Sequence, residues 1–217
     1  MRLAVLAALL AVAIAGCGTV AATPLIPRGR PAGGAVPGVA DRLAATARQR
    51  YDEEVRGGAV HTQLNRAASD PALLRALRIG DAAGLKLAAT RLQKQPGHIS
   101  RLRIRNGSGG LVDVGVPFCV AGSRTMLRAP DGKPLGTLEV SVQDEIGFVR
   151  YMHRNYPVDV LVRGAGGEVR TSLSAARGVK LPVKGPVTIA GRRYDVRSFS
   201  RMALDAEPVT VWILVAL

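Results

Sequence analysis

The spacing of apolar residues changes once along this chain, at Pro96-Gly97. From Val39 to Leu92, apolar side chains recur every three or four residues, which is typical of amphipathic helices. From Ile99 onward they mostly alternate with polar ones, as in half-buried strands. A chain that places its helices first and its strands afterwards is expected to fold as an α+β domain with an antiparallel sheet.

Caps and turns predict where these elements begin and end. Gly57-Gly58 ends the first helix, Asp70-Pro71 starts another, and Gly80 followed by Asp81 separates that helix from the next. Apolar residues within 143–155 predict one short helix among the strands. The predicted strands cover residues 99–105, 111–116, 118–127, 135–142, 158–162, 168–173, 187–190, 192–200 and 209–217. The last run is apolar on both faces, which predicts a central, buried strand.

The composition excludes several classes of protein. The 217 residues suffice for a sizeable core, and the hydrophobic fraction of 47% excludes a disordered chain. Two cysteines and three histidines exclude a disulfide scaffold and multi-cysteine zinc sites. The net charge of +14 is spread along the chain and only 4% of residues are aromatic, so we expect no nucleic-acid partner. Attraction to anionic lipid head groups suits such a chain better.

The N-terminus predicts export. After Met1-Arg2, residues 3–15 contain no polar side chain, a run too short to span a bilayer and typical of a secretory signal peptide. Ile14-Ala15-Gly16-Cys17 resembles the lipobox of bacterial lipoproteins, in which the signal peptide is cut before a cysteine that carries diacylglycerol. The alternatives are an ordinary exported protein or an uncleaved anchor, with Cys17 incidental.

The lipobox interpretation divides the chain into three parts. Residues 1–16 would be the signal peptide, and residues 17–40, rich in Pro, Gly and Ala, a flexible tether from lipidated Cys17. Residues 41–217 would form a single domain on the outer face of the cytoplasmic membrane. Two acyl chains anchor a protein stably in a membrane, whereas a single chain gives only marginal, reversible binding.

The order of elements in residues 41–217 resembles the extracytoplasmic Cache sensor domain, a relative of PAS. Residues 97–104 resemble that family's entry into the first strand, and residues 106–112 its hairpin. Pro130-Asp131-Gly132-Lys133 and the alternating strand after it are similar to another family hairpin. The resemblance implies N-terminal helices and an antiparallel sheet that curves around a small-molecule pocket, with a short inserted helix.

The resemblance also implies a function. Cache domains sit between two transmembrane helices, ahead of an output module, and this chain shows neither a second span nor an output module. We therefore expect a lipid-anchored ligand-binding or sensor domain that acts through a separate membrane signalling protein. The alternative is an envelope structural or interaction lipoprotein with a basic surface and no small-molecule pocket.

Catalytic motifs are not evident in the sequence. There is no His-Glu-x-x-His, P-loop or Gly-x-Ser-x-Gly pattern, so we expect neither an enzyme nor a cofactor or metal site. Cys119 could pair with a distant histidine, but its apolar neighbours favour a buried, inert thiol.

Three groups of residues are candidates for lining a pocket. Arg124 opens a strand, Arg150, Tyr151 and His153 lie on the short helix, and Tyr156 and Asp159 follow it. Arginine with tyrosines suits a carboxylate or phosphate, and a nearby aspartate suits an amine, so we expect a small, anionic metabolite of the carboxylate or amino-acid class. For each residue, an ordinary surface role is the competing interpretation. The alternating residues Arg101, Arg103 and Arg105 form an alternative anion site or a plain solvent-facing edge.

Overall fold

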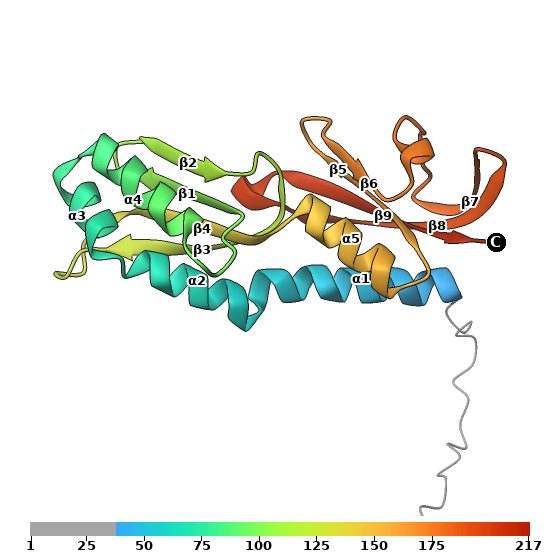
Figure 1. The fold of residues 1–217 in the computed structure, drawn as a ribbon, viewed down its shortest axis with the longest axis horizontal. Coiled ribbons are helices and arrows are strands. Elements are labelled where there is room, and N and C mark those ends of the chain that lie inside the picture. The colour runs from blue at the N-terminus through green and yellow to red at the C-terminus, as the bar shows by residue number, and fades with distance from the viewer. Residues whose placement is uncertain (1–37) are drawn as a thin grey trace, which may run out of the picture. The chain divides into compact units, whose positions relative to one another are not determined.

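The computed structural model describes residues 38–217, and Figure 1 shows their fold. The predictions for residues 1–37, which include the signal peptide, Cys17 and most of the tether, lie outside the described residues. Four helices come first, as predicted: α1 (Val39–Arg56), α2 (Gly58–Ala68), α3 (Pro71–Ile79) and α4 (Ala82–Lys94). The first helix starts at Val39, slightly before the predicted boundary at residue 41.

The predicted caps lie where the helices begin and end. The Asp70 carboxylate accepts a hydrogen bond from the Leu73 N–H, and the Asp81 carboxylate accepts one from the Gly84 N–H, each at 2.9 Å. Between these helices Gly80 has φ +73°, the left-handed conformation that ends a helix and that glycine adopts without strain. Local signals therefore determine this helical region closely.

The strands form two antiparallel sheets rather than the one that we expected. Sheet A has the order β2-β1-β4-β3, and sheet B has the order β6-β5-β9-β8-β7. The strands of sheet A are β1 (Arg101–Asn106), β2 (Leu111–Gly115), β3 (Cys119–Arg128) and β4 (Pro134–Asp144). Those of sheet B are β5 (Asp159–Gly164), β6 (Val169–Thr171), β7 (Lys184–Ile189), β8 (Arg192–Met202) and β9 (Pro208–Ala216).

Both sheets follow one plan. In sheet A, β1 lies between β2 and β4, and β4 also pairs with β3. In sheet B, β5 lies between β6 and β9 in the same way, and β9 also pairs with β8. Sheet B differs by one further strand, β7, at its edge. The α+β class is confirmed, as is the prediction that the C-terminal strand is central, because β9 lies between β5 and β8. The predicted short helix is α5 (Glu145–Asn155), which connects the two sheets.

Helices cover the sheets from one side. Figure 1 shows α1 and α2 end to end, with α1 along sheet B and α2 along sheet A. α1 contacts β8 and β9 and also β3 of sheet A, while α2 contacts β3 and β4. Tyr51 of α1 is 1% exposed, donates a hydrogen bond to the Met202 carbonyl at 2.9 Å, and meets the rings of Phe148 and Phe199 edge-on. This tyrosine fastens α1 to sheet B and to α5.

The arginines of β1 correct another expectation. They do not line a solvent-facing edge, because β1 lies between β2 and β4. The Asp113 carboxylate is 2.7 Å from Arg101 Nη2 and 3.0 Å from Arg103 Nε, and Arg103 is only 8% exposed. These two arginines therefore bind a carboxylate of their own chain, which leaves little basis for a separate anion site there.

Candidate functional site

The covered faces of both sheets are occupied by the protein's own side chains. In sheet A, Leu102, Leu138 and Val140 are fully buried against leucines and alanines of α2, α3 and α4. In sheet B, apolar clusters pack against both faces, one with α1 and α5 and the other with the connection between β6 and β7. The concave sheet pocket that the family resemblance implies is thus filled where these helices lie.

An open hollow lies instead at the rim of sheet B. It has a volume of about 380 Å³, and we call it the α5 hollow because it adjoins the C-terminal end of that helix. It is lined by His153, Tyr156, Pro157, Val158, Asp159, Arg192, Leu214, Val215 and Ala216. The residues come from the end of α5, the starts of β5 and β8, and the end of β9, which antiparallel pairing brings together.

Asp159 and His153 form the fixed part of this hollow. The Ser172 hydroxyl donates a hydrogen bond to Asp159 Oδ1 at 2.9 Å, and His153 Nδ1 lies 3.2 Å from the same oxygen. His153 Nδ1 also lies 2.9 Å from the Val158 carbonyl oxygen, which can only accept, so Nδ1 carries the proton. With Nδ1 committed to these acceptors, Nε2 remains the nitrogen that can meet a ligand.

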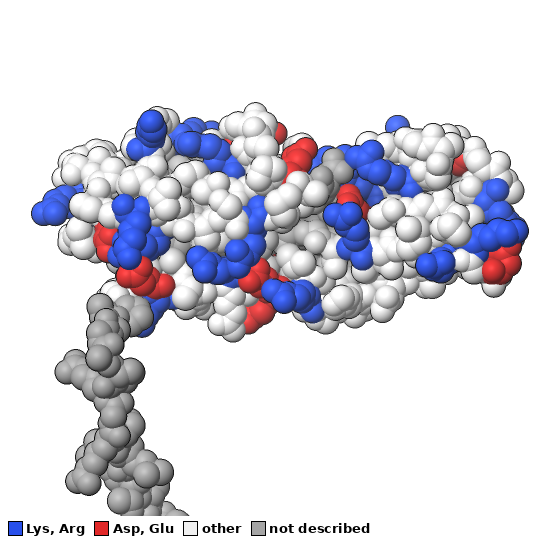
Figure 2. All heavy atoms as spheres, turned by 180° about the vertical axis from the view of Figure 1, so that it is seen from behind, with Lys and Arg blue, Asp and Glu red and all other residues white. Residues whose placement is uncertain are grey.

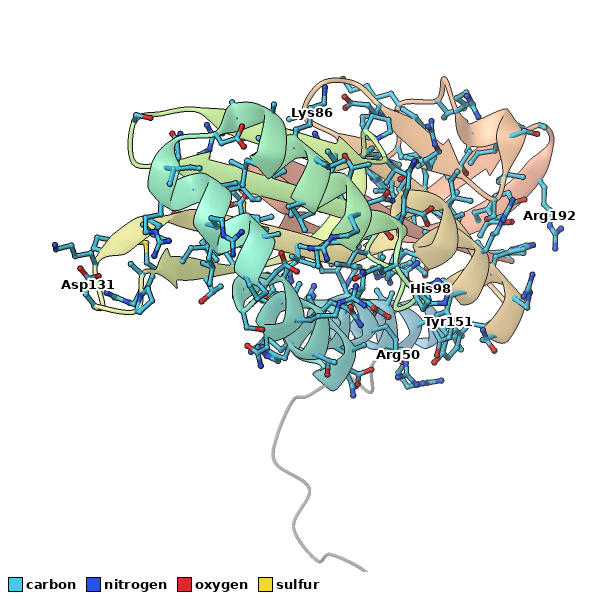
Figure 3. All side chains as sticks on the ribbon, turned by 60° about the vertical axis from the view of Figure 1, so that its left-hand side comes forward. Arg50, Lys86, His98, Asp131, Tyr151 and Arg192 are labelled. Carbon is cyan, nitrogen blue, oxygen red and sulfur yellow. The ribbon has the colours of Figure 1, made fainter. Side chains whose placement is uncertain are left out.

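Arg192 supplies positive charge at the opposite side of the hollow. It lies at the start of β8, and Figure 3 shows it extending from the end of sheet B. Its guanidinium carbon is 5.7 Å from the centre of the Tyr194 ring, a cation–π contact that leaves the N–H donors available. Arg192 was not predicted from the sequence, because only the pairing of β8 with β9 brings it near the end of α5.

Two tyrosines connect the hollow with α1. The rings of Tyr151 and Tyr156 meet at 6.5 Å between centroids, and the Arg50 guanidinium lies 5.7 Å from the centre of the Tyr151 ring. Figure 3 shows Arg50 and Tyr151 near each other, from α1 and α5. A hydrogen bond with Tyr156 raises the pKa of Arg50 above its ordinary value. Tyr156 lines the hollow, whereas Tyr151 does not line it but contacts the ring of Tyr156.

The structure does not bring Arg124 and Arg150 to this place. Arg124 lies on β3 in sheet A, 3.8 Å from Glu139, beside a crevice of about 30 Å³ that holds no more than a water molecule. Arg150 is exposed on α5, one turn before His153, and does not line the hollow. Of the six predicted site residues, His153, Tyr156 and Asp159 line one hollow, and Tyr151 contacts the ring of Tyr156.

Two further reactive groups of the described residues, Cys119 and Glu145, are buried. Cys119 is 1% exposed, and burial raises the pKa of its thiol to about 12, so the nucleophilic thiolate is suppressed. Glu145 is also buried, which raises the pKa of its carboxyl, and its partner is Arg170 at 2.8 Å. In residues 38–217 there is no group of three or more His, Cys, Asp and Glu side chains that could hold a metal ion.

In the described part of the chain, no helix is both long and apolar enough to cross a bilayer.

Comparison with known proteins identifies the fold. No protein-family model matches the sequence, and no curated protein is significantly similar to it. Two crystal structures of the LuxQ periplasmic domain from Vibrio cholerae superpose with TM-scores of 0.54 and 0.53, at 11% and 10% identity. Each covers 82% of this chain, and the matches span 98% and 100% of the LuxQ domains.

A further solved structure is similar at a lower level. The ligand-binding domain of the amino-acid chemoreceptor PctB from Pseudomonas aeruginosa, in complex with L-Arg, has a TM-score of 0.46 at 9% identity, covering 81% of this chain and 92% of that one. At such identities, similarity establishes the fold and nothing more. On the LuxQ superposition, the chain has the α+β fold of that periplasmic domain, which is the PAS-like class of fold that the sequence predicted.

Proposed function

We propose that this chain is a lipid-anchored, extracytoplasmic sensor domain that binds a small carboxylate or amino acid in the α5 hollow. It has no catalytic activity of its own and acts through a separate membrane signalling protein. The observation that carries the proposal is the convergence of His153, Asp159 and Arg192 on one hollow. Its volume of about 380 Å³ falls in the range of small-molecule sites, about 300–1,000 Å³.

The charges in the hollow match a zwitterion. The Arg192 guanidinium can donate two parallel hydrogen bonds to a carboxylate. Asp159 keeps acceptor capacity beyond its bond from Ser172, so it can accept from an ammonium group. His153 Nε2 can accept a hydrogen bond when the ring is neutral and donate one when it is charged. Val215 and Ala216, which also line the hollow, supply an apolar side for the ligand's carbon chain.

Export and anchoring rest on the sequence. The apolar run at residues 3–15 and the lipobox-like residues ending at Cys17 support them. Mass spectrometry of the chain extracted from membranes tests the anchor: we expect a diacylglyceryl group on Cys17, and release of a Cys17→Ser variant from the membrane. An unacylated wild-type chain would contradict the anchor.

A thermal-shift screen with amino acids and dicarboxylates tests the site. A ligand at a hundred times its Kd stabilises the folded state by about 2.7 kcal/mol. We expect a shift for the wild type, and a loss of affinity of tenfold or more for Arg192→Gln. The matched control is Arg193→Gln, which removes the same charge from the neighbouring residue and should bind like the wild type. Equal affinity in both variants would refute the assignment of Arg192.

Asp159→Asn separates the two ligand classes. If the ligand is an amino acid, this variant should weaken binding because it removes the partner of the ammonium group. If the ligand is a carboxylate without an amine, the variant should bind as well as the wild type or better. Asp159 also accepts a hydrogen bond from Ser172, so Asp159→Asn can change the stability of the unliganded chain. The shift of each variant is therefore measured from its own thermal unfolding midpoint without ligand.

The filled sheet faces favour the second candidate, an interaction lipoprotein without a small-molecule pocket. The resemblance implies a pocket enclosed by the sheet, but buried apolar clusters occupy the covered faces of both sheet A and sheet B. This candidate predicts that no small molecule shifts the midpoint, while salt-sensitive binding to anionic vesicles persists after delipidation.

A further inference from the structure

One stretch of the chain carries positive charge without any acidic residue. Between Glu168 and Asp195 there are 26 residues, of which six are Lys or Arg and none is Asp or Glu. The stretch comprises β6, the connection to β7, β7 itself and the start of β8. Five of its basic residues are exposed, and we call them the basic end: Arg177, Lys180, Lys184, Arg192 and Arg193.

The basic end lies where the chain enters the described structure. Lys184 Nζ is 3.5 Å from Asp41 in the first turn of α1. Figure 1 shows the N-terminal end of α1, the β6–β7 connection, β7 and the start of β8 at the same end of sheet B. Figure 2, seen from behind, shows basic side chains over much of the visible face, several of them at this end.

Nearby acidic groups do little to cancel this charge. Asp41 and Asp195 are both paired with Arg197, which is not among the five residues, and Asp41 also pairs with Lys184. Arg177, Lys180 and Arg193 form no ion pair with another described residue. Two exposed valines accompany them, Val39 at 54% and Val183 at 75% exposure. Positive charge beside exposed apolar side chains is the surface that suits a lipid–water interface.

We infer that the basic end docks on the anionic head groups of the membrane that carries the anchor. The inference rests on the anchor of the proposed function, and its test leaves Arg192, the one residue that the basic end shares with the hollow, unchanged. From Cys17 to Val39 the chain can extend at most about 75 Å, so an anchor at Cys17 keeps this end of sheet B close to the lipid. Tethering raises the local concentration of head groups, and each Lys or Arg near an anionic surface strengthens docking by about fivefold.

Trp212 provides a probe at the right place. It is the only tryptophan of the chain, and its indole N–H donates a hydrogen bond to the Pro182 carbonyl at 3.1 Å, beside Val183. The acylated chain extracted from membranes is reconstituted in vesicles that contain a dansyl lipid. Energy transfer from Trp212 to dansyl then reports how closely this end approaches the bilayer.

We expect higher transfer in phosphatidylglycerol–phosphatidylcholine vesicles than in pure phosphatidylcholine, and a fall to the neutral level in high salt. The triple variant Arg177→Gln, Lys180→Gln, Arg193→Gln should weaken docking about a hundredfold. The matched control is Arg75→Gln, Arg78→Gln, Lys86→Gln, which removes three exposed charges from α3 and α4 and should retain docking.

Three outcomes would overturn the inference: equal transfer on neutral and anionic vesicles, equal loss in both triple variants, or docking that is insensitive to salt. The salt dependence of the wild type decides the matter even if the test variant is unstable. The mass of the reconstituted chain reports acylation separately. An unacylated chain that still docks on anionic vesicles would refute the lipid anchor but would support docking by the basic end.

Discussion

Sheet A and sheet B share a strand order but use their faces differently. Sheet A buries one face under α2, α3 and α4 and carries charge on the other, where Asp113, Arg103, Glu139 and Arg124 lie side by side across its four strands. Sheet B buries apolar residues on both faces, and its central strand β9 is apolar throughout its middle. The same strand order thus occurs with a polar face in sheet A and without one in sheet B.

The difference explains where binding chemistry can lie. The charged face of sheet A is internally paired, and Leu204 from the β8–β9 connection of sheet B packs against it so closely that a Cβ on Gly122 would lie 2.5 Å from the leucine. Sheet B has no polar face, so its polar groups gather at the rim, where the α5 hollow and the basic end are found. Side-chain packing occupies the faces of both sheets, so the binding site that we propose lies at the edge of sheet B.

The largest expected effect comes from opening a cavity in either sheet. Leu138→Ala in sheet A and Leu214→Ala in sheet B each remove a fully buried side chain and should lower the free energy of unfolding by about 2–5 kcal/mol. Urea unfolding followed by circular dichroism measures this. Leu87→Ala, at a position 74% exposed, is the control and should change stability by less than about 0.5 kcal/mol.

Since α5 connects the two sheets and α1 contacts strands of both, we expect a single unfolding transition in both cavity variants. Two separated transitions, with only one sheet affected by each variant, would show that the sheets fold independently.

The charged face of sheet A gives the next effect. Asp113→Asn takes the carboxylate from Arg101 and from the buried Arg103, and breaking a buried pair in this way costs about 3 kcal/mol. Asp131→Asn is the control, because its pair with Lys133 is exposed and should contribute less than about 1 kcal/mol. Denaturant midpoints measure both. Similar small losses would mean that this face is solvated rather than structural.

A smaller effect appears in acid, at the junction of α1 with sheet B. Hydrogen bonding from Arg197 lowers the pKa of the Asp41 carboxyl to about 2 from an ordinary 3.8. A lowered pKa contributes stability above the unfolded value, and this contribution disappears as pH falls from about 4 towards about 2. In that pH window, the thermal unfolding midpoint should depend less steeply on pH in Arg197→Gln than in the wild type, whereas Arg193→Gln should keep the wild-type slope. An unchanged slope in Arg197→Gln would contradict this origin.

The smallest effect concerns Cys119, where β3 begins. Because burial raises the pKa of its thiol to about 12, iodoacetamide should alkylate it slowly at mildly alkaline pH in the folded chain and rapidly in urea. Peptide mapping by mass spectrometry separates it from Cys17. Rapid alkylation of the folded chain would mean that the start of β3 opens readily.

Local signals predicted much of this fold, and long-range pairing explains the rest. Asp70, Gly80 and Asp81 act on backbone groups within one helical turn, so their roles follow from the sequence. Alternation shows which residues share a face, but not which strand lies beside them, so the division into two sheets and the burial of Arg103 were not foreseen.

The candidate site shows the same limit. Tyr156 and Asp159 are close in sequence to His153, and chain proximity was enough to predict them together. Arg192 reaches the hollow only through the register of β8 with β9, in which Tyr194 lies opposite Ala216. Arg124 was predicted to line the pocket because it opens a strand, but that strand is β3 of sheet A, whereas the hollow lies at the rim of sheet B.

The location of binding is the central claim, and backbone NMR of the labelled chain titrated with the ligand class found in the thermal-shift screen tests it most directly. Binding at the rim predicts shifts in the amide signals of residues 153–159, 192 and 214–216, with those of β1 and β4 unchanged. Shifts centred on Leu102, Leu138 and the facing helices would instead place the guest beneath α2, α3 and α4 and contradict the account.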